Sequence, residues 1–350
     1  MKLTQRQQKI LLLALQASPL QSSKILELLI AKGEEISLIT IKRELTDLTT
    51  EGYLMIKGVG RSTAYEISVK GRLFVEMNTS LYCTIDPDKR YGLSSYNFEL
   101  FDSILPPLFT ETEQKIFDEA TAEYKRRTAN ISPTIEKKEL ERLIIELSWK
   151  SSRIEGNTYT LLDTEKLILE NKEAAGHSKD EARMILNHKD AFSFIRDNEG
   201  EYKSLTKINL EHLHKLLVDG LNVGFGLRGK PVGVIGSKYQ PLDNVYQITE
   251  GVESLSRAID RMDSPYAKAL LAVLGISYLQ PFEDGNKRTA RLMANAILLA
   301  YGLAPLSYRS VEENEYREAM LVFYEINSLV PFKKIFITQY DFAARTYMVK

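Results

Sequence analysis

Residues 280–291 read QPFEDGNKRTAR, and an apolar stretch flanks them on each side, 269–279 before and 292–301 after. Each apolar stretch predicts a buried helix, so the polar residues form a loop that leads into the second helix. A carboxylate, a flexible glycine and a capping amide occupy positions 284–286, where that helix begins. Because a helix N-terminus favours an anion through its free N–H groups and its dipole, the stretch predicts a phosphate site.

The charged side chains of this stretch suit a phosphate that is bound together with a metal ion. Arg288 and Arg291 lie three residues apart and share one helix face, so both guanidinium groups can reach one polyanion. Asp284 is the expected Mg²⁺ ligand, because magnesium usually takes one or two carboxylates together with phosphate oxygens. Lys287 either adds a contact to phosphate or occludes the site.

The same residues resemble the Fic-family motif, which reads His-Pro-Phe, any residue, Asp or Glu, Gly-Asn-Gly-Arg, two further residues and Arg. The resemblance implies an all-helical domain that binds ATP and Mg²⁺ and transfers AMP to a Ser, Thr or Tyr hydroxyl of a target protein. Lys287 replaces the usual glycine, as in the Doc branch, whose family activity is phosphoryl transfer. The residues implied to hold nucleotide are Asp284, Gly285, Asn286, Lys287, Arg288 and Arg291, with Asp284 as the metal ligand.

Gln280 stands where the Fic family has the histidine that deprotonates the target hydroxyl. An amide cannot accept a proton near neutral pH, and losing a positioned base costs on the order of 100- to 10,000-fold in rate. None of the chain's histidines is expected to replace it; core or surface roles are expected for them. The sequence leaves open a weakened adenylyltransferase, an inactive nucleotide-sensing protein, removal of AMP from a modified protein, and an engineered inactivating change at position 280.

A second motif lies upstream, where Ser151, Glu155 and Gly156 resemble the inhibitory pattern of Fic proteins: Ser or Thr, three residues, Glu, then Gly or Asn. The resemblance implies an inhibitory helix over 137–156, whose glutamate pairs with Arg291 and blocks a productive position of the nucleotide. Taken alone, the glutamate is better explained as a carboxylate of a helix surface or C-terminal turn, but the two motifs together favour inhibition. Whether inhibition acts within one chain or between the chains of a homodimer stays open.

Residues 224–241 interrupt the helical pattern with five glycines and predict a short β-hairpin. This position matches the flap of Fic proteins, which docks a target segment by strand pairing. The expected docking residues are therefore Val232, Val234 and Ile235.

Residues 1–72 predict three helices followed by two strands, the order of a winged helix-turn-helix. They carry 11 Lys and Arg against 7 Asp and Glu, a net charge of +4 in a chain whose total is −1. Winged helices bind DNA but also serve as dimerisation or docking units, so both roles stay open. The candidates for DNA contact are Thr40, Lys42 and Arg43 in the major groove, and Lys57 and Arg61 at phosphates beside the wing.

The chain as a whole is predicted to be mainly α, with a winged helix-turn-helix domain over 1–72, a partly helical connector over 73–132 and a Fic-type domain over 133–350. Its composition, 44% hydrophobic and 27% charged, is that of a globular protein. No apolar stretch approaches the roughly 20 residues of a membrane span, so no membrane partner is expected. Cys83 is the only cysteine, which excludes an internal disulfide and suits the cytoplasm.

Overall fold

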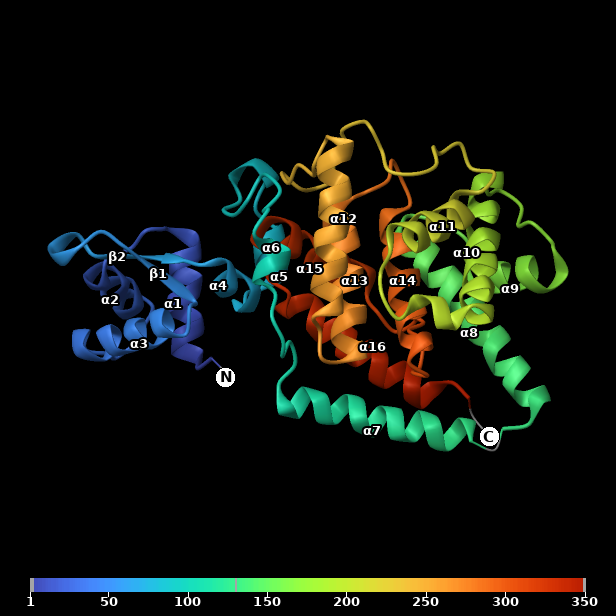
Figure 1. Cartoon of the computed structure of the whole chain (residues 1–350), viewed down its shortest axis with the longest axis horizontal. Helices are drawn as coiled ribbons and strands as arrows, with labels where there is room; N and C mark the ends of the chain where they lie inside the picture. Colours follow the sequence, from blue (N-terminus) through green and yellow to red (C-terminus); the bar gives the residue numbers. More distant parts are fainter. Residues whose placement is uncertain (1–2, 130, 349–350) are drawn as a thin grey trace. The chain divides into compact units, whose positions relative to one another are not determined.

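The computed structural model describes residues 3–129 and 131–348, which are drawn in Figure 1. The chain forms two compact units. Helices make up most of both units, and the sheet formed by the described residues has two strands, so the chain is mainly α, as predicted. The first unit comprises Met1–Ile104, Gly233–Gln240 and Glu318–Phe332, and the second comprises Leu105–Val232, Pro241–Arg317 and Lys333–Lys350.

The first unit begins with helices α1 (Gln5–Gln16), α2 (Ser22–Ala31) and α3 (Leu38–Thr50), followed by strands β1 (Leu54–Lys57) and β2 (Ala64–Ile67). The strands pair antiparallel, with Leu54 opposite Ile67. Thr4 and Gln7 form a capping box at the start of α1, and Ser37 caps α3. Apolar side chains of these helices, among them Ile10, Ile25 and Leu45, are fully buried in one hydrophobic core.

The first unit continues beyond residue 72 with short helices and an ionic cluster. The helices are α4 (Val69–Phe74), α5 (Thr79–Cys83) and α6 (Leu100–Ser103). Glu325 is fully buried and accepts hydrogen bonds from the Tyr82 hydroxyl at 2.6 Å and the Ser237 hydroxyl at 2.6 Å. The Arg90 guanidinium donates to the same carboxylate at 3.2 Å and to the Gly236 carbonyl at 2.9 Å. These bonds anchor residues 233–240 within the first unit.

The regular elements of the second unit are all helices, and this unit contains residues 280–291. Its α13 is buried over most of its length, because nearly all its side chains are apolar. The helices are α7 (Glu111–Thr128), α8 (Pro133–Ile154), α9 (Leu161–Glu170), α10 (Lys179–Asp197), α11 (Lys207–Val218), α12 (Val245–Asp260), α13 (Pro265–Leu279) and α14 (Asn286–Ala300), with parts of α15 (Glu313–Ile326) and α16 (Val330–Thr346). Short 3₁₀ helices lie at Gly60–Ser62, Pro87–Lys89 and Glu199–Tyr202.

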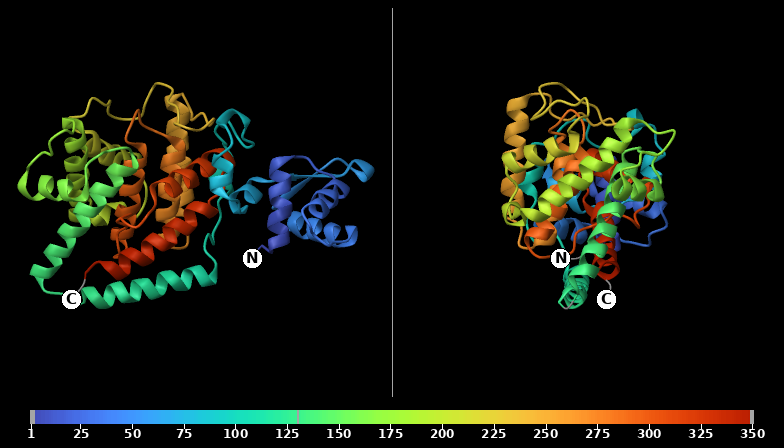
Figure 2. Two further views of the ribbon diagram at one scale, coloured as in Figure 1. Left: turned by 180° about the vertical axis from the view of Figure 1, so that it is seen from behind. Right: turned by 90° about the vertical axis from the view of Figure 1, so that its right-hand side faces the viewer.

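Helix α14 packs side by side with α13 and also contacts α8, α10 and α11 (Figure 1). Along another side of the unit, α7 lies beside α16, as Figure 1 and Figure 2 show. There Phe117 meets the rings of Phe336 and Tyr340, with centroids 6.1 Å and 5.4 Å away. The N-terminal end of α14 is therefore surrounded by helices that come from distant parts of the sequence. Among the helices of the described residues, none combines the length and the apolar character that a membrane span requires.

The predicted hairpin over 224–241 is not what the structure contains. The segment is extended with one turn, in which Ser237 N–H donates to the Val234 carbonyl at 3.1 Å, and none of its residues belongs to a strand. Its backbone groups bind elsewhere: Arg228 N–H donates to the Pro281 carbonyl at 3.0 Å, and Gln240 N–H to the Ser94 carbonyl at 2.9 Å. Such bonds replace the cross-strand ladder that a hairpin needs.

Candidate functional site

The loop between α13 and α14 is fixed by its own residues. Gln280 ends α13 in the left-handed conformation, with φ 48° and ψ 59°, and Gly285 begins α14 with φ 78°. The Asn286 side chain accepts from Phe282 N–H and donates to the Phe282 carbonyl, each at 2.8 Å. This pair of bonds closes the loop over four residues and holds the first N–H groups of α14 at its rim.

His214 on α11 supports the same loop from outside. Its ring stacks on Phe282 with centroids 3.7 Å apart and planes 5° from parallel. Its Nε2 lies 3.0 Å from the Asp284 carbonyl; since a carbonyl only accepts, Nε2 is assigned as the donor. Burial lowers the pKa of His214 to about 4, so the ring is neutral at pH 7. A core or surface role was expected for the histidines, and this contact was not foreseen.

Arg288 lies in the first turn of α14 and is almost fully buried, with 2% of its side chain exposed. Its Nη2 donates to Asp284 Oδ2 at 3.2 Å. Its Nε and Nη1 are buried and have no hydrogen-bond partner among the described residues. A buried guanidinium with unpaired donors carries a large desolvation penalty, which an anion at the start of α14 would offset.

Arg291, one turn further along α14, is bound by the end of α8. Its Nη1 donates to Glu155 Oε1 at 2.9 Å, its Nε to the Ser151 hydroxyl at 2.9 Å and its Nη2 to the Ser151 carbonyl at 2.7 Å. Gly156 follows with φ 98°, a conformation that suits glycine and turns the chain away from α8. The structure thus brings Ser151 and Glu155 onto Arg291, and Arg288 and Arg291 do not share one partner.

Lys287 also reaches Glu155, with its Nζ 3.4 Å from Oε2. The Glu155 side chain is 18% exposed, against 31% for Lys287 and none for Arg291. Burial acts to raise the pKa of Glu155, but the charges of Arg291 and Lys287 outweigh it, so the pKa lies below its ordinary value. Glu155 is therefore a carboxylate at neutral pH, held by two cations from the first turns of α14.

Tyr316 on α15 completes the surroundings of Arg291. The Arg291 guanidinium carbon lies 5.5 Å from the centre of the Tyr316 ring, and Nη1 donates to its hydroxyl at 3.3 Å. The sequence left this tyrosine unassigned, because a tyrosine at helical spacing is more often part of the core. No local pattern links it to Arg291, which lies 25 residues away in the sequence.

The Gln280 side chain turns back onto its own helix. Its Nε2 donates to the Ser277 carbonyl at 2.6 Å, and the residue is 8% exposed. The Gln280 carbonyl accepts from Arg228 Nε at 2.7 Å. Position 280 thus presents no group that accepts a proton at neutral pH.

Of the two exposed carboxylates in this loop, Glu283 and Asp284, Asp284 is the one that pairs with Arg288. Its side chain is 68% exposed and lies beside the unpaired donors of Arg288. The described residues contain no group of three or more His, Cys, Asp or Glu side chains arranged to hold a metal. One carboxylate beside a phosphate site nevertheless fits Mg²⁺, which shares its coordination with substrate oxygens and waters.

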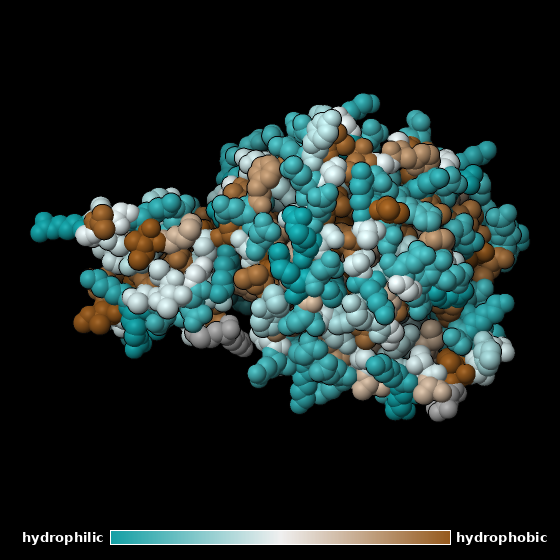
Figure 3. Space-filling view, in the orientation of Figure 1, coloured by the Kyte–Doolittle hydropathy of each residue, from teal (hydrophilic) through white to brown (hydrophobic). Residues whose placement is uncertain are grey.

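The flap candidates belong to segment 224–241, and the DNA candidates belong to the first unit. Val232 and Val234 are half-buried, whereas Ile235 is 99% exposed. In the first unit Lys42, Arg43 and Arg61 are exposed; Lys57 pairs with Glu66 at 3.3 Å, and the Thr40 hydroxyl bonds to that of Ser37 at 3.0 Å. Apolar side chains lie exposed among them, chiefly Ile39 at 82% and Val59 at 86%, and Figure 3 shows such brown patches between polar residues.

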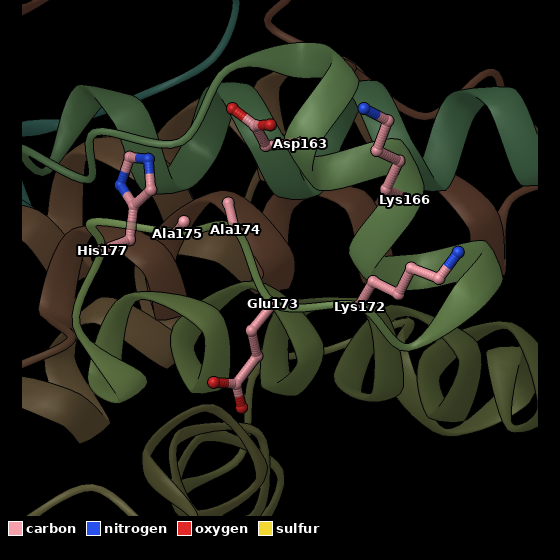
Figure 4. A pocket seen from close by; sticks show the side chains of 7 residues that line it. All are labelled: Asp163, Lys166, Lys172, Glu173, Ala174, Ala175 and His177. Atoms are coloured by element: carbon pink, nitrogen blue, oxygen red, sulfur yellow. The ribbon is translucent and has the colours of Figure 1, made fainter.

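A separate pocket of about 280 Å³ lies between α9 and the segment that leads to α10. Three of its polar side chains are already partnered: Asp163 accepts from the Thr160 hydroxyl at 2.6 Å, Lys172 pairs with Glu170 at 2.6 Å, and His177 Nδ1 lies 2.8 Å from the Thr158 hydroxyl. Figure 4 shows the Glu173 side chain pointing away from the others. This pocket contains no residue of the motif loop and offers no comparable chemistry.

Comparison with known proteins matches a known family to the segment that contains the loop 280–291. Residues 204–298 match the model of the Fic/DOC family. The protein named "Protein adenylyltransferase Fic" from Nematostella vectensis is 27% identical over 174 residues, covering 49% of this chain and 41% of that protein. Its namesake from Drosophila willistoni is 26% identical over 178 residues, covering 48% and 34%. The chain therefore matches less than half the length of these relatives.

Solved structures agree on the fold. A Fic-domain-containing signalling protein from Bacteroides thetaiotaomicron superposes with a TM-score of 0.54 at 19% identity, over 65% of this chain and 94% of that one. A Fic family protein from Desulfovibrio desulfuricans gives a TM-score of 0.56 at 22% identity, over 69% and 75%. Residues 204–298, which contain the motif loop, therefore match the Fic/DOC family, and the chain shares its helical fold with proteins that contain a Fic domain.

Proposed function

We propose that this chain binds ATP with Mg²⁺ and transfers AMP to a Ser, Thr or Tyr hydroxyl of a target protein, from a resting state that Glu155 restrains and with a rate that Gln280 limits. The observation that carries the proposal is the pairing pattern of the two arginines of α14. Arg288 has two buried, unpaired donors, while Arg291 is occupied by Glu155. The relatives named as protein adenylyltransferases support the reaction class.

The phosphates of the nucleotide would lie at the start of α14. Arg288 would donate its free Nε and Nη1 to phosphate oxygens, and the N–H groups after Gly285 would add further bonds. Mg²⁺ held by Asp284 would neutralise phosphate charge and orient the pyrophosphate leaving group. The target hydroxyl oxygen would attack the α-phosphorus as the bond to pyrophosphate breaks, and its proton would pass to solvent water, since Gln280 cannot accept it.

Glu155 restrains this site in two ways. It occupies Arg291, so that Arg291 cannot bind a phosphate, and it places a negative charge where the outer phosphates would lie. The carboxylate stays charged through the neutral range because Arg291 and Lys287 lower its pKa. Binding of the outer phosphates therefore requires the end of α8 to release both cations.

Gln280 favours a second candidate function, that of a nucleotide-sensing protein without transfer activity. Its amide is engaged with the Ser277 carbonyl and has no means of taking the hydroxyl proton. The phosphate-binding residues do not depend on that amide. In this case nucleotide binding would be the signal, and the N-terminal unit, as a DNA-binding or docking module, would be its output.

Transfer from ATP labelled at the α- or the γ-phosphate distinguishes these functions. We expect weak α-label transfer from the Glu155→Ala chain and an increase on the order of 100- to 10,000-fold when Gln280→His is added, because a general base is restored. Transfer of the γ-label instead would indicate phosphoryl transfer. If the double variant binds ATP but transfers neither label, the transferase proposal fails and nucleotide sensing remains.

A further inference from the structure

Arg228 is buried in the second unit at the base of segment 224–241, with 2% of the residue exposed. Its guanidinium donates to three backbone carbonyls: Gln280 through Nε at 2.7 Å, Lys230 through Nη1 at 2.7 Å, and Leu242 through Nη2. Its own N–H donates to the Pro281 carbonyl at 3.0 Å. One residue thus joins the base of this segment to two consecutive residues of the motif loop.

The backbone at position 280 is one that requires such support. A residue with a side chain rarely adopts φ 48° and ψ 59°, and the conformation persists only where its surroundings enforce it. Gln280 N–H is fixed by the Ile276 carbonyl at 3.0 Å, and its carbonyl by Arg228. Because both peptide groups are held, the Cα–Cβ direction at position 280 is fixed as well.

We propose that Arg228 is a positioning residue for the transfer step: it locks the left-handed backbone at position 280 and thereby sets where the side chain at that position reaches. Its donors face backbone carbonyls, so it acts through residue 280. The fork of the guanidinium matches this task, because three carbonyls at different angles are reached by one planar group, which a lysine ammonium cannot do from one point. The catalytic part of the proposal rests on the proposed function; the backbone part does not.

The kinetic test uses the Glu155→Ala, Gln280→His chain as background, with Arg228→Lys and Arg228→Gln added separately. We expect kcat for AMP transfer to fall on the order of 100-fold, since a misplacement of about 1 Å has that effect, while the Kd for Mg-ATP changes less than about twofold. Arg142→Lys is the matched control, because Arg142 also donates to a backbone carbonyl, that of Thr346, away from the motif loop. The control should leave both constants unchanged.

Amide hydrogen exchange in the chain with Glu155 and Gln280 unchanged tests the backbone part independently of activity. Arg228→Lys and Arg228→Gln should speed exchange at Gln280 and Phe282 while leaving α8 as protected as before. Three results would each overturn the proposal: an unchanged kcat, unchanged exchange at these two amides, or a fall in kcat accompanied by a comparable loss of ATP affinity and a lower Tm. If the background chain itself transfers no AMP, the proposed function fails, and the exchange result alone decides the role of Arg228.

Discussion

Among single residues, one carboxylate and the cations around it determine whether Arg291 is available to a nucleotide in the proposed function. Glu155 contacts Arg291 at 2.9 Å and Lys287 at 3.4 Å. Removing one partner of a buried pair leaves the other uncompensated, but Arg291 also donates to Ser151 and Tyr316, which reduces that penalty. The pair is therefore a contact that a phosphate can replace without leaving Arg291 stranded.

Substitution of Lys287 tests how much this residue, as opposed to Arg291, contributes to holding Glu155. Lys287→Ala should tighten Mg-ATP binding by no more than about fivefold, because a partly exposed ion pair contributes roughly 0.2–1 kcal/mol. In a Glu155→Ala background the same change should give no gain. Calorimetry on the four chains of this cycle measures the coupling directly. A loss of affinity in both backgrounds would show that Lys287 binds phosphate and does not strengthen the restraint.

The sequence predicted part of this site and missed the rest for a physical reason. Ser151, Glu155 and the residues of 280–291 belong to two local motifs whose spacing is visible along the chain. The contacts of His214 with Asp284 and of Arg228 with Gln280 join residues 70 and 52 positions apart. Neither contact leaves a periodic or compositional signal, because the sequence around His214 or Arg228 does not show which distant residue the side chain contacts.

At the scale of elements, the beginning of α14 depends on Gly285. Its φ is 78°, and a Cβ atom there would lie 3.3 Å from Val218 Cγ1. Gly302, just after α14, has φ 64° but open space around a Cβ. The two glycines carry similar backbone strain, and one of them also abuts α11.

Gly285→Ala should therefore weaken Mg-ATP binding, whereas Gly302→Ala should not. Both should lower the free energy of unfolding by about 1–2 kcal/mol, the cost of the left-handed conformation for a residue with a Cβ, and Gly285→Ala by more. Urea unfolding and calorimetry on the same samples measure the two effects. Equal ATP affinities for the two variants would contradict a phosphate site at the start of α14.

Elements were predictable where side-chain periodicity determines them. The helix expected over 137–156 is α8, Pro133–Ile154, with Glu155 as its cap, and the helices on both sides of 280–291 are α13 and α14. Segment 224–241 was not predictable as extended chain, because its glycines signal only that a helix is absent. Its shape is set by bonds to Ser94 and Pro281, which lie far away in sequence.

The molecule as a whole combines the Fic-type part with a first unit that carries the candidates for DNA contact. Lys42 and Arg43 are exposed on α3, and Arg61 is exposed between β1 and β2, a distribution that suits contact with a phosphate backbone. We expect weak, sequence-independent binding to duplex DNA, with a Kd on the order of 10⁻⁴ to 10⁻⁶ M at physiological salt.

Fluorescence anisotropy with a labelled duplex at several salt concentrations checks this expectation. Lys42→Ala and Arg43→Ala should each weaken binding and reduce the salt slope by about 1 per lost phosphate contact. Lys24→Ala serves as the control, since Lys24 lies on α2 and pairs with Glu27 at 2.6 Å. Absence of binding at low salt would contradict a DNA-binding role for these residues.

Titration of Mg-ATP into the unsubstituted chain and two variants shows whether Glu155 restrains a nucleotide site. Glu155→Ala is compared with Glu313→Ala, which removes an equal charge whose partners, Lys150 and Arg153, also lie on α8. We predict that Glu155→Ala tightens binding on the order of 10-fold or more, since Arg291 gains a charge-assisted bond to phosphate, and that Glu313→Ala changes nothing. Equal affinity in all three chains, or no binding in any of them, would contradict the account.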